Sequence, residues 1–352
     1  MSFTERFDLA LPLIQAPMAG VSTPRMAAAV CEAGGLGSIA VGATDAAGAR
    51  AMIEDLRGRT ARAFNVNLFV HGTARADPAR EAAWLEWLAP RFAEFGAEPP
   101  AQLRTIYQSF ADDPDMLALL IELAPPVVSF HFGLPPAAAL AALRARGIYL
   151  MATATSLGEA RAIEAAGIDA VVAQGIEAGG HRGDFAPEAP DDALGSFALS
   201  RLLVREAGLP VIAAGGIMDG AGIAAALDLG AAAAQLGTAF IACPESAADD
   251  GYRAALMGPG AYHTALTPLI SGRPARALPN RFTALAAPCG GRTPPDYPIA
   301  YDAGKALHAA AKARGEHGFG AHWAGQGAPL ARAMPAAELV QTLRREFEGC
   351  RG

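Results

Sequence analysis

The chain has 352 residues, of which 52% are hydrophobic and 18% are charged. This length is large for one minimal domain and ordinary for a single α/β barrel that carries an insertion. The formal net charge of −7 argues against a nucleic acid or an anionic membrane surface as the partner, and an anionic substrate would need a locally positive pocket.

Short apolar runs typical of strands alternate with alanine-rich helical stretches up to about residue 242. Residues 22–35, for example, combine a Ser/Thr cap, a first-turn proline and a terminal glycine pair, which together predict a helix. The predicted strands are residues 13–17, 35–40, 63–70, 126–132, 148–153, 169–174, 210–216 and 231–240. Strict alternation predicts a parallel sheet with right-handed crossovers. Eight such units, with no GxGxxG after the first strand, favour a TIM (β/α)8 barrel over a doubly wound sheet.

Two segments depart from this repeat. Residues 74–125 form one long connection in which two helices are expected before the fourth strand. Residues 243–317 are rich in Pro, Gly and Arg, and we interpret them as a small inserted lid or substrate domain after strand eight. The barrel itself would then comprise residues 1–242 and 318–352, with the last helix closing the outer ring.

The sequence also bears on the compartment. Cys31, Cys243, Cys289 and Cys350 lie far apart and form no CxxC motif, so we expect reduced thiols and no zinc site. Residues 224–243 are weakly charged, but Asp228 and glycines interrupt them, so no membrane span is predicted. The first residues lack the basic-then-apolar pattern of a secretory signal. We therefore expect a soluble, cytoplasmic protein without a metal site.

Polar residues and glycines gather at the predicted strand ends, where binding groups lie in a TIM barrel. Asn65 and Asn67 alternate along the third strand and so share one face. Residues 213–217 (AAGGI) and 235–238 (QLGT) end strands seven and eight, whose loops often bind phosphate through backbone N–H groups. Either segment alone is more typical of a packing turn. Together, at consecutive strand ends, they predict a phosphate site.

Four histidines need an explanation. His181, in the stretch QGIEAGGHRG after strand six, is either a solvated loop residue or an active-site residue, and its position favours the site. His131 ends strand four and either packs in the core beside its neighbouring phenylalanines or reaches the site, which we favour. No carboxylate accompanies His317 and His322, so they do not predict a metal pair.

An ordered set of motifs resembles the FMN-dependent nitronate monooxygenases, formerly called nitropropane dioxygenases. The motifs are QAPMAG, NVNLFV, SFHFG, QGIEAGGH, VIAAGGI, QLGTAF, SGRPARALPNRF and WAGQG, from residue 12 to about 327. AAGGI and QLGT are shared with flavin-dependent enoyl-acyl-carrier-protein reductases and with inosinate-type nucleotide dehydrogenases. The latter need a loop cysteine, and no cysteine lies in a matching loop. QAPM with SFHFG indicates the monooxygenases, in the class that uses no nicotinamide cofactor.

The resemblance implies a set of FMN contacts. The phosphate would be held by Gly215, Gly216, Gln235, Leu236, Gly237 and Thr238, the isoalloxazine edge by Asn67 and Gln174, and further flavin contacts would come from Met18, Gly179 and Gly180. It also implies that Tyr297, Tyr301 and Lys305 lie over the flavin.

The residues around Lys305 give a related indication. Tyr301 and Lys305 are four apart and would share a helix face, with Tyr297 one turn earlier if the helix begins there, although Pro298 argues against that. The alternative is an ordinary surface helix. Lys305 is one of only two lysines among 28 basic residues, and its ammonium offers a compact charge to a small anion.

The predicted function is FMN-dependent oxidation of alkyl nitronates with O2, with propionate-3-nitronate as the substrate that the resemblance implies. The alternatives are an NAD(P)H-dependent flavin reductase acting on quinones or enoyl thioesters, and a flavin-binding protein with vestigial activity. His181, with an ordinary pKa of about 6.5, could act as a base on neutral nitroalkanes or, protonated, as an electrostatic partner of a nitronate. We favour the electrostatic role because Arg182 and Lys305 suggest an anion pocket. A monomer or homodimer is expected.

Overall fold

A closed barrel of parallel strands forms the centre of the molecule. The computed structural model describes residues 1–287 and 289–351, and within them eight strands follow the order β1, β9, β8, β6, β5, β4, β3, β2. Their bounds are β1 Leu13–Gln15, β2 Gly37–Ala40, β3 Phe64–Phe69, β4 Val127–His131, β5 Tyr149–Ala154, β6 Ala170–Gln174, β8 Val211–Ala214 and β9 Ala233–Leu236. The ring closes where the Gln15 amide donates to the Leu36 carbonyl at 3.0 Å. The predicted TIM barrel is confirmed, and each predicted strand range overlaps one observed strand, with β5 ending one residue beyond the predicted range 148–153.

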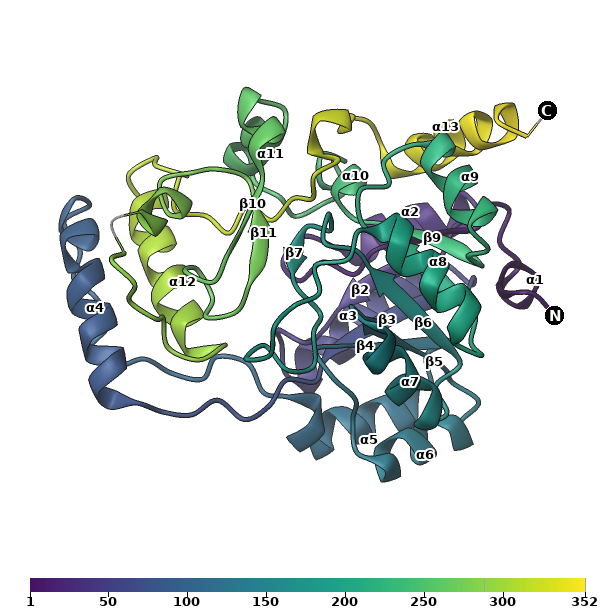
Figure 1. Ribbon diagram of the computed structural model, residues 1–352, viewed down its shortest axis with the longest axis horizontal. Helices are drawn as coiled ribbons and strands as arrows, with labels where there is room; N and C mark the ends of the chain where they lie inside the picture. The colour runs from purple at the N-terminus through teal and green to yellow at the C-terminus, as the bar shows by residue number, and fades with distance from the viewer. Residues whose placement is uncertain (288, 352) are drawn as a thin grey trace.

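Helices cover the outside of this barrel (Figure 1). They are α2 Pro24–Glu32, α3 Ala46–Arg59, α5 Pro114–Leu123, α6 Ala137–Ala145, α7 Leu157–Ala165, α8 Ser196–Glu206, α9 Gly220–Asp228 and α13 Ala336–Gly349. The expected start of α2 is present, because the Thr23 hydroxyl accepts from the Met26 amide and Pro24 occupies the first turn. The last helix, α13, packs Leu339 and Leu343 beside α2 and α9, so it completes the outer ring as predicted.

The barrel has two apolar layers. Residues such as Val66, Val128 and Val171 point outward and pack against the surrounding helices. At the other end from the site, Phe3 of α1 (Phe3–Phe7) packs against Tyr149 with ring centroids 6.0 Å apart. The interior is therefore filled at one end, which leaves the carboxyl ends of the strands as the place for a cavity.

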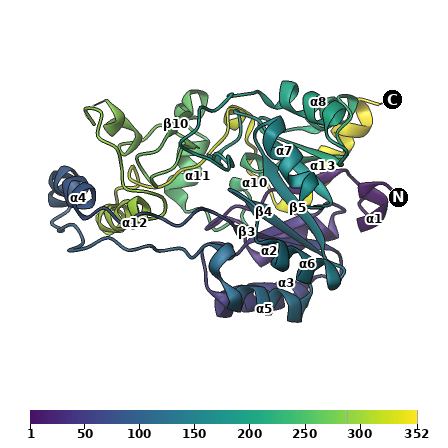
Figure 2. The same ribbon diagram turned by 60° about the horizontal axis from the view of Figure 1, so that its bottom comes forward.

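A second core lies away from the barrel. Helix α4 (Pro78–Ala93) contributes Trp84, Leu88 and Phe92, which pack with Leu307 of α12 (Ile299–Lys312) and with Phe319. Figure 1 and Figure 2 both show α4 beside α12 and apart from the helices of the barrel. The two helices expected between strands three and four are confirmed as α4 and α5. We propose that the lid comprises α4 together with residues 243–317, in place of residues 243–317 alone.

A small antiparallel sheet joins the lid to the barrel. Its strands are β10 (Ala265–Thr267), β11 (Ala275–Ala277) and β7 (Gly180–His181), in that order. Strand β7 belongs to the loop after β6, and His181 pairs with Ala275 across the ladder. The remaining helices are α10 (Thr238–Ile241) after β9 and α11 (Asp250–Leu256) in the lid. The histidine loop is therefore held as an edge strand against β11, which lies about 90 residues later in the chain.

In the described residues, no helix combines the length and the apolar character that a bilayer crossing requires.

Candidate active site

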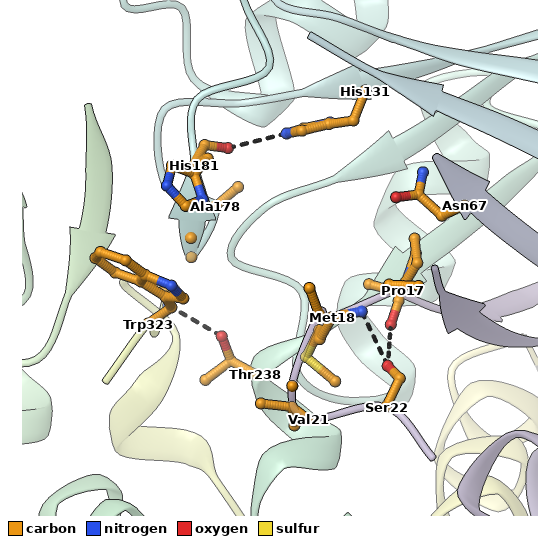
Figure 3. Close-up of a pocket in the computed structure, with 18 of the residues that line it drawn as sticks. Pro17, Met18, Val21, Ser22, Asn67, His131, Ala178, His181, Thr238 and Trp323 are labelled. Atoms are coloured by element: carbon orange, nitrogen blue, oxygen red, sulfur yellow. Dashed lines mark hydrogen bonds between the residues drawn. The ribbon is translucent and has the colours of Figure 1, made fainter. Parts of the chain in front are cut away.

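A cavity of about 510 Å³ opens at the carboxyl ends of the barrel strands, beneath the lid. Its volume lies within the range of ordinary small-molecule sites, about 300–1,000 Å³. Of the residues predicted for the site, all line it except Arg182, which is described below, and Leu236, whose side chain packs in the core between the barrel and α13. Figure 3 shows His181 and Trp323 on one side of the cavity, with Asn67 on another and Met18 and Thr238 below. The cavity thus collects strand ends and lid residues that are far apart in sequence.

The ends of β8 and β9 form a cradle of backbone groups. Gly215 and Gly216 have φ of +116° and +73°, a region that side-chain-bearing residues rarely adopt. Within residues 1–287 and 289–351, no protein acceptor pairs with the N–H groups of Gly216 and Ile217. Thr238 accepts from the Gly325 amide at 3.0 Å, so its own hydroxyl proton remains available to donate. Unpaired N–H donors beside a hydroxyl fit a single phosphate group.

Two side-chain amides reach the cavity, but they differ in how many of their hydrogen-bonding groups already have protein partners. Asn67 donates to the Ser129 hydroxyl at 3.0 Å, while its carbonyl oxygen has no protein partner in the described part of the chain. Gln174 uses both ends of its amide: it donates to the His181 carbonyl at 3.0 Å and accepts from the Gly183 amide at 2.8 Å. Asn67 can therefore offer an acceptor to a flat ring, whereas Gln174 chiefly holds the histidine loop.

His181 stands in an aromatic enclosure. Its ring centroid is 5.1 Å from that of Trp323, 5.3 Å from Tyr297 and 5.7 Å from Phe132. Burial, aided by the charge of Arg273, lowers the pKa of His181 to about 3, so the imidazole is neutral at neutral pH. This direction of the pKa argues against the expected role of His181 as a protonated partner of the nitronate. A neutral imidazole carries one lone pair and fits the role of a base.

His131 supports His181 from behind. Its Nε2 donates to the His181 carbonyl at 3.2 Å, because a carbonyl oxygen can only accept, and its Nδ1 pairs with the Thr153 hydroxyl at 3.0 Å. Burial lowers the pKa of His131 to about 4. Both alternatives for this residue hold in part, since it lines the cavity and also packs 4.5 Å from the Phe132 ring.

Lys305 lies at the rim of the cavity on α12. Its ammonium is 4.9 Å from the ring centroid of Tyr107 and 5.4 Å from that of Tyr301, and partial desolvation lowers its pKa. No carboxylate lies within 4 Å of it among the described residues. Tyr297 lies outside this helix, because α12 begins at Ile299, so the idea that it shares the helix face of Lys305 is wrong. It reaches the cavity from the preceding loop instead.

Arg182 does not supply positive charge to the site. Its side chain is 3% exposed, pairs with Asp191 at 2.8 Å and donates to the Gln174 carbonyl at 2.5 Å. It is absent from the lining of the cavity in the described residues, so the expectation that it helps bind an anion is wrong. Its guanidinium, paired with the Asp191 carboxylate, instead holds the loop between β6 and α8 in place.

Tyr107 and Trp323 are two aromatic residues of the site that, like several other lining residues, were not assigned from the sequence. Tyr107 comes from the irregular part of the connection between α4 and α5, and Trp323 from the segment WAGQG that follows the lid. Neither lies at a strand end, and neither follows a periodic pattern that would indicate its direction. Only the arrangement of α12 and its neighbours brings Tyr107 within 6.0 Å of the Tyr301 ring.

His317 and His322 form no metal site. Across the residues that the structure describes, no group of three or more His, Cys, Asp or Glu side chains could hold a metal ion. His322 instead stacks on Tyr252, with ring centroids 4.9 Å apart, and His317 approaches Asp249 at 3.6 Å. The four cysteines are all free thiols, and none lines the cavity in the described residues.

The closed barrel, the glycine cradle after β8 and β9 and the enclosed histidine define a class, the flavin-dependent oxidoreductases built on a TIM barrel. A family model described as nitronate monooxygenase matches residues 2–346. The chain belongs to the nitronate monooxygenase family.

Similar proteins agree with this assignment. A nitronate monooxygenase of Paraburkholderia phytofirmans is 64% identical over 337 residues, covering 96% of this chain and 92% of the relative. One of Pseudomonas aeruginosa is 59% identical over 347 residues, covering 99% of both chains. Among solved structures, a nitroalkane oxidase from Streptomyces ansochromogenes has a TM-score of 0.89 and 42% identity, covering 100% of this chain and 99% of its own. FabK from Thermotoga maritima has a TM-score of 0.75 and 30% identity, covering 99% and 96%.

Proposed function

We propose that the protein oxidises alkyl nitronates with O2, using bound FMN. The observation that carries this proposal is the single cavity that joins a cradle for one phosphate to His181 and the aromatic enclosure. The nitronate monooxygenases of Paraburkholderia phytofirmans and Pseudomonas aeruginosa, which match nearly the whole chain, support it.

FMN fits the residues present better than FAD does. The cradle after β8 and β9 offers donors for one phosphate, and the sequence carries no dinucleotide fingerprint for a second. Gly215, Gly216, Gly237 and Thr238 would hold the phosphate, while Asn67 would accept from the ring edge. Bound FMN would accept electrons from the substrate and pass them to O2. The protein's own residues bind the substrate, exclude water and handle its proton.

Neutral nitroalkanes are a second proposed substrate class. A neutral His181 supports it, because only an unprotonated imidazole can remove the proton from the carbon that bears the nitro group. The similar Streptomyces ansochromogenes structure, a nitroalkane oxidase, also supports it. The nitronate that this proton transfer produces is the substrate of the oxidation proposed above.

The test of the proposed function is oxygen uptake by the purified protein. We expect rapid O2 consumption with nitronates in the absence of NADH, and a heat-released cofactor that chromatographs as FMN. Anaerobic NADH or NADPH should leave the flavin oxidised. Rapid bleaching by either nucleotide would instead support the reductase alternative. If neither nitronates nor nicotinamide nucleotides react with the flavin, the remaining alternative is a flavin-binding protein with vestigial activity.

Lys305 is proposed to bind the carboxylate of propionate-3-nitronate. It is the one lysine that lines the cavity in the described residues, and no protein carboxylate neutralises it there. We expect Lys305→Met to raise KM for propionate-3-nitronate by about tenfold, since a hydrogen bond to a charged group contributes about 1.5 kcal/mol. KM for the nitronate of nitroethane, which lacks the carboxylate, should change little.

The matched control for this prediction is Lys312→Met. Lys312 lies on the same helix but pairs with Asp249 at 2.7 Å and does not line the cavity. Equal increases in KM for both nitronates in Lys305→Met would contradict the assigned role and indicate a general effect on the site.

We also propose a cytoplasmic protein that acts as a monomer or homodimer. The four free thiols, three of them buried, support a reducing compartment.

A further inference from the structure

His181 makes one side-chain hydrogen bond, to a residue of the lid. Its Nε2 lies 2.9 Å from the Oγ of Ser271, which belongs to the turn between β10 and β11 and is fully buried. The same Oγ lies 3.2 Å from the carbonyl oxygen of Arg273 and also accepts from the Arg273 backbone amide at 3.4 Å. Ser271 therefore stands between a ring nitrogen that can donate or accept and a carbonyl that can only accept.

Counting protons decides the direction of both bonds. The Ser271 hydroxyl has one proton, and in the described residues no other donor reaches the Arg273 carbonyl. If that proton went to His181, the carbonyl would be left buried and unpaired, which is unfavourable. If it goes to the carbonyl, the Ser271 oxygen accepts from a protonated Nε2, and the hydroxyl, the carbonyl and Nε2 all have partners. The second arrangement fixes the proton of the neutral imidazole on Nε2.

The other ring nitrogen is then a bare lone pair. Nδ1 of His181 has no hydrogen-bond partner in the described chain, yet it is absent from the buried unpaired atoms, so it has surface exposed to the cavity. The groups around the ring are aromatic faces: Phe132, Tyr297, Tyr301 and Trp323. Nδ1 is thus the atom that this side chain presents to a substrate.

We propose that Ser271 is a positioning residue that holds His181 as the Nε2–H tautomer, so that Nδ1 acts as the base. In the reaction, the bond between the nitroalkane carbon and its proton breaks and the proton moves to Nδ1. The electron pair forms the C=N bond, and the negative charge passes to the nitro oxygens. His181 becomes an imidazolium whose Nε2–H still donates to Ser271. The inference rests on the proposed use of His181 with neutral nitroalkanes.

The direct test is ¹⁵N NMR of the holoenzyme with ring-labelled histidine. We expect the His181 resonances, assigned by their loss in His181→Asn, to report a protonated Nε2 and an unprotonated Nδ1 near pH 7. In Ser271→Ala we expect a measurable population of the Nδ1–H tautomer. A wild-type His181 protonated on Nδ1, or an unchanged tautomer in Ser271→Ala, would overturn the proposal.

Kinetics give the second readout. Ser271→Ala should lower kcat for nitroethane on the order of tenfold, the loss typical of removing an outer partner that orients a histidine. KM and the rate with preformed nitronate should change little. Ser200→Ala is the matched control, because Ser200 is also fully buried but lies on α8 without a hydrogen-bond partner in the described residues.

The outcomes separate this inference from the proposed function. Equal losses in Ser271→Ala and Ser200→Ala, or equal losses with nitroethane and its nitronate, would overturn the positioning role. If the wild type oxidises neither substrate, the proposed function fails, and the NMR measurement still decides whether Ser271 sets the tautomer. If Ser271→Ala does not fold, the wild-type spectrum alone supports or overturns the assignment.

Discussion

His181→Asn is expected to lower kcat/KM for nitroethane by a factor of about 10²–10⁴, the contribution of a positioned general base. The physical reason is that the neutral, buried imidazole is the base that we propose for the site, with Nδ1 facing the cavity. The rate with preformed nitronate should be largely retained, since that substrate has already lost its proton. Steady-state oxygen uptake with both substrates measures the difference.

The pH dependence of the wild type tests the same assignment. Because burial holds the pKa of His181 at about 3, the base stays unprotonated from pH 8 down to pH 5. The nitroethane rate should therefore show no inflection near the ordinary histidine pKa of about 6.5. The control for the His181→Asn variant is His263→Asn, a substitution at an exposed lid residue that should leave both rates unchanged.

If the nitronate rate of His181→Asn falls as much as its nitroethane rate, the result would contradict the base and indicate an electrostatic role.

Gly179→Ala is expected to weaken flavin binding by about tenfold or more. A Cβ on Gly179 would lie 2.5 Å from the Gly325 amide nitrogen and 2.7 Å from the Ala324 carbonyl carbon, and both are backbone atoms that cannot turn aside. The two loops are also tied where the Gln326 amide donates to the Glu177 carbonyl at 2.9 Å. Forcing them apart costs about 1–3 kcal/mol and displaces both sides of the cavity. The flavin-to-protein absorbance ratio after gel filtration measures the loss.

Gly58→Ala provides a matched control for this substitution. Gly58 lies near the end of α3, exposed, with nothing within 4 Å of an added Cβ. Alanine there should stabilise the helix by up to about 1 kcal/mol and leave the flavin content unchanged. A Gly179→Ala protein with full flavin content and wild-type rates would show that the two loops can separate without cost.

Local sequence patterns were sufficient to predict the barrel. Each strand is a short buried run bounded by turn residues, and helix starts such as Thr23-Pro24 carry their own caps, so the alternation can be read without tertiary information. The same holds for the part of the cradle after β8, because the local backbone there requires glycine, as the positive φ of Gly215 and Gly216 demonstrates. These features depend on neighbours within a few residues.

Other features depend on partners that are distant in sequence. From the sequence, Arg182 was expected to offer a positive charge to the site, but in the fold it forms an ion pair with Asp191. Helix α4 lies in the middle of the barrel sequence, but its apolar face is buried against α12, more than 200 residues later. The length of the connection at residues 74–125 indicated a departure from the strand–helix repeat. It could not indicate where the helix within that connection packs.

The protonation state of His181 belongs to this second group. The sequence by itself determined that a histidine follows strand six in a glycine-rich loop beside a cofactor-sized site. Only the tertiary structure encloses this histidine so that its pKa falls, and places Ser271 where we propose that it fixes the proton on Nε2. The enclosing rings and Arg273 lower its pKa, and Ser271, 90 residues away, accepts from Nε2. Burial and hydrogen-bond direction are properties of the assembled site, because each depends on groups that only the closed fold brings into contact.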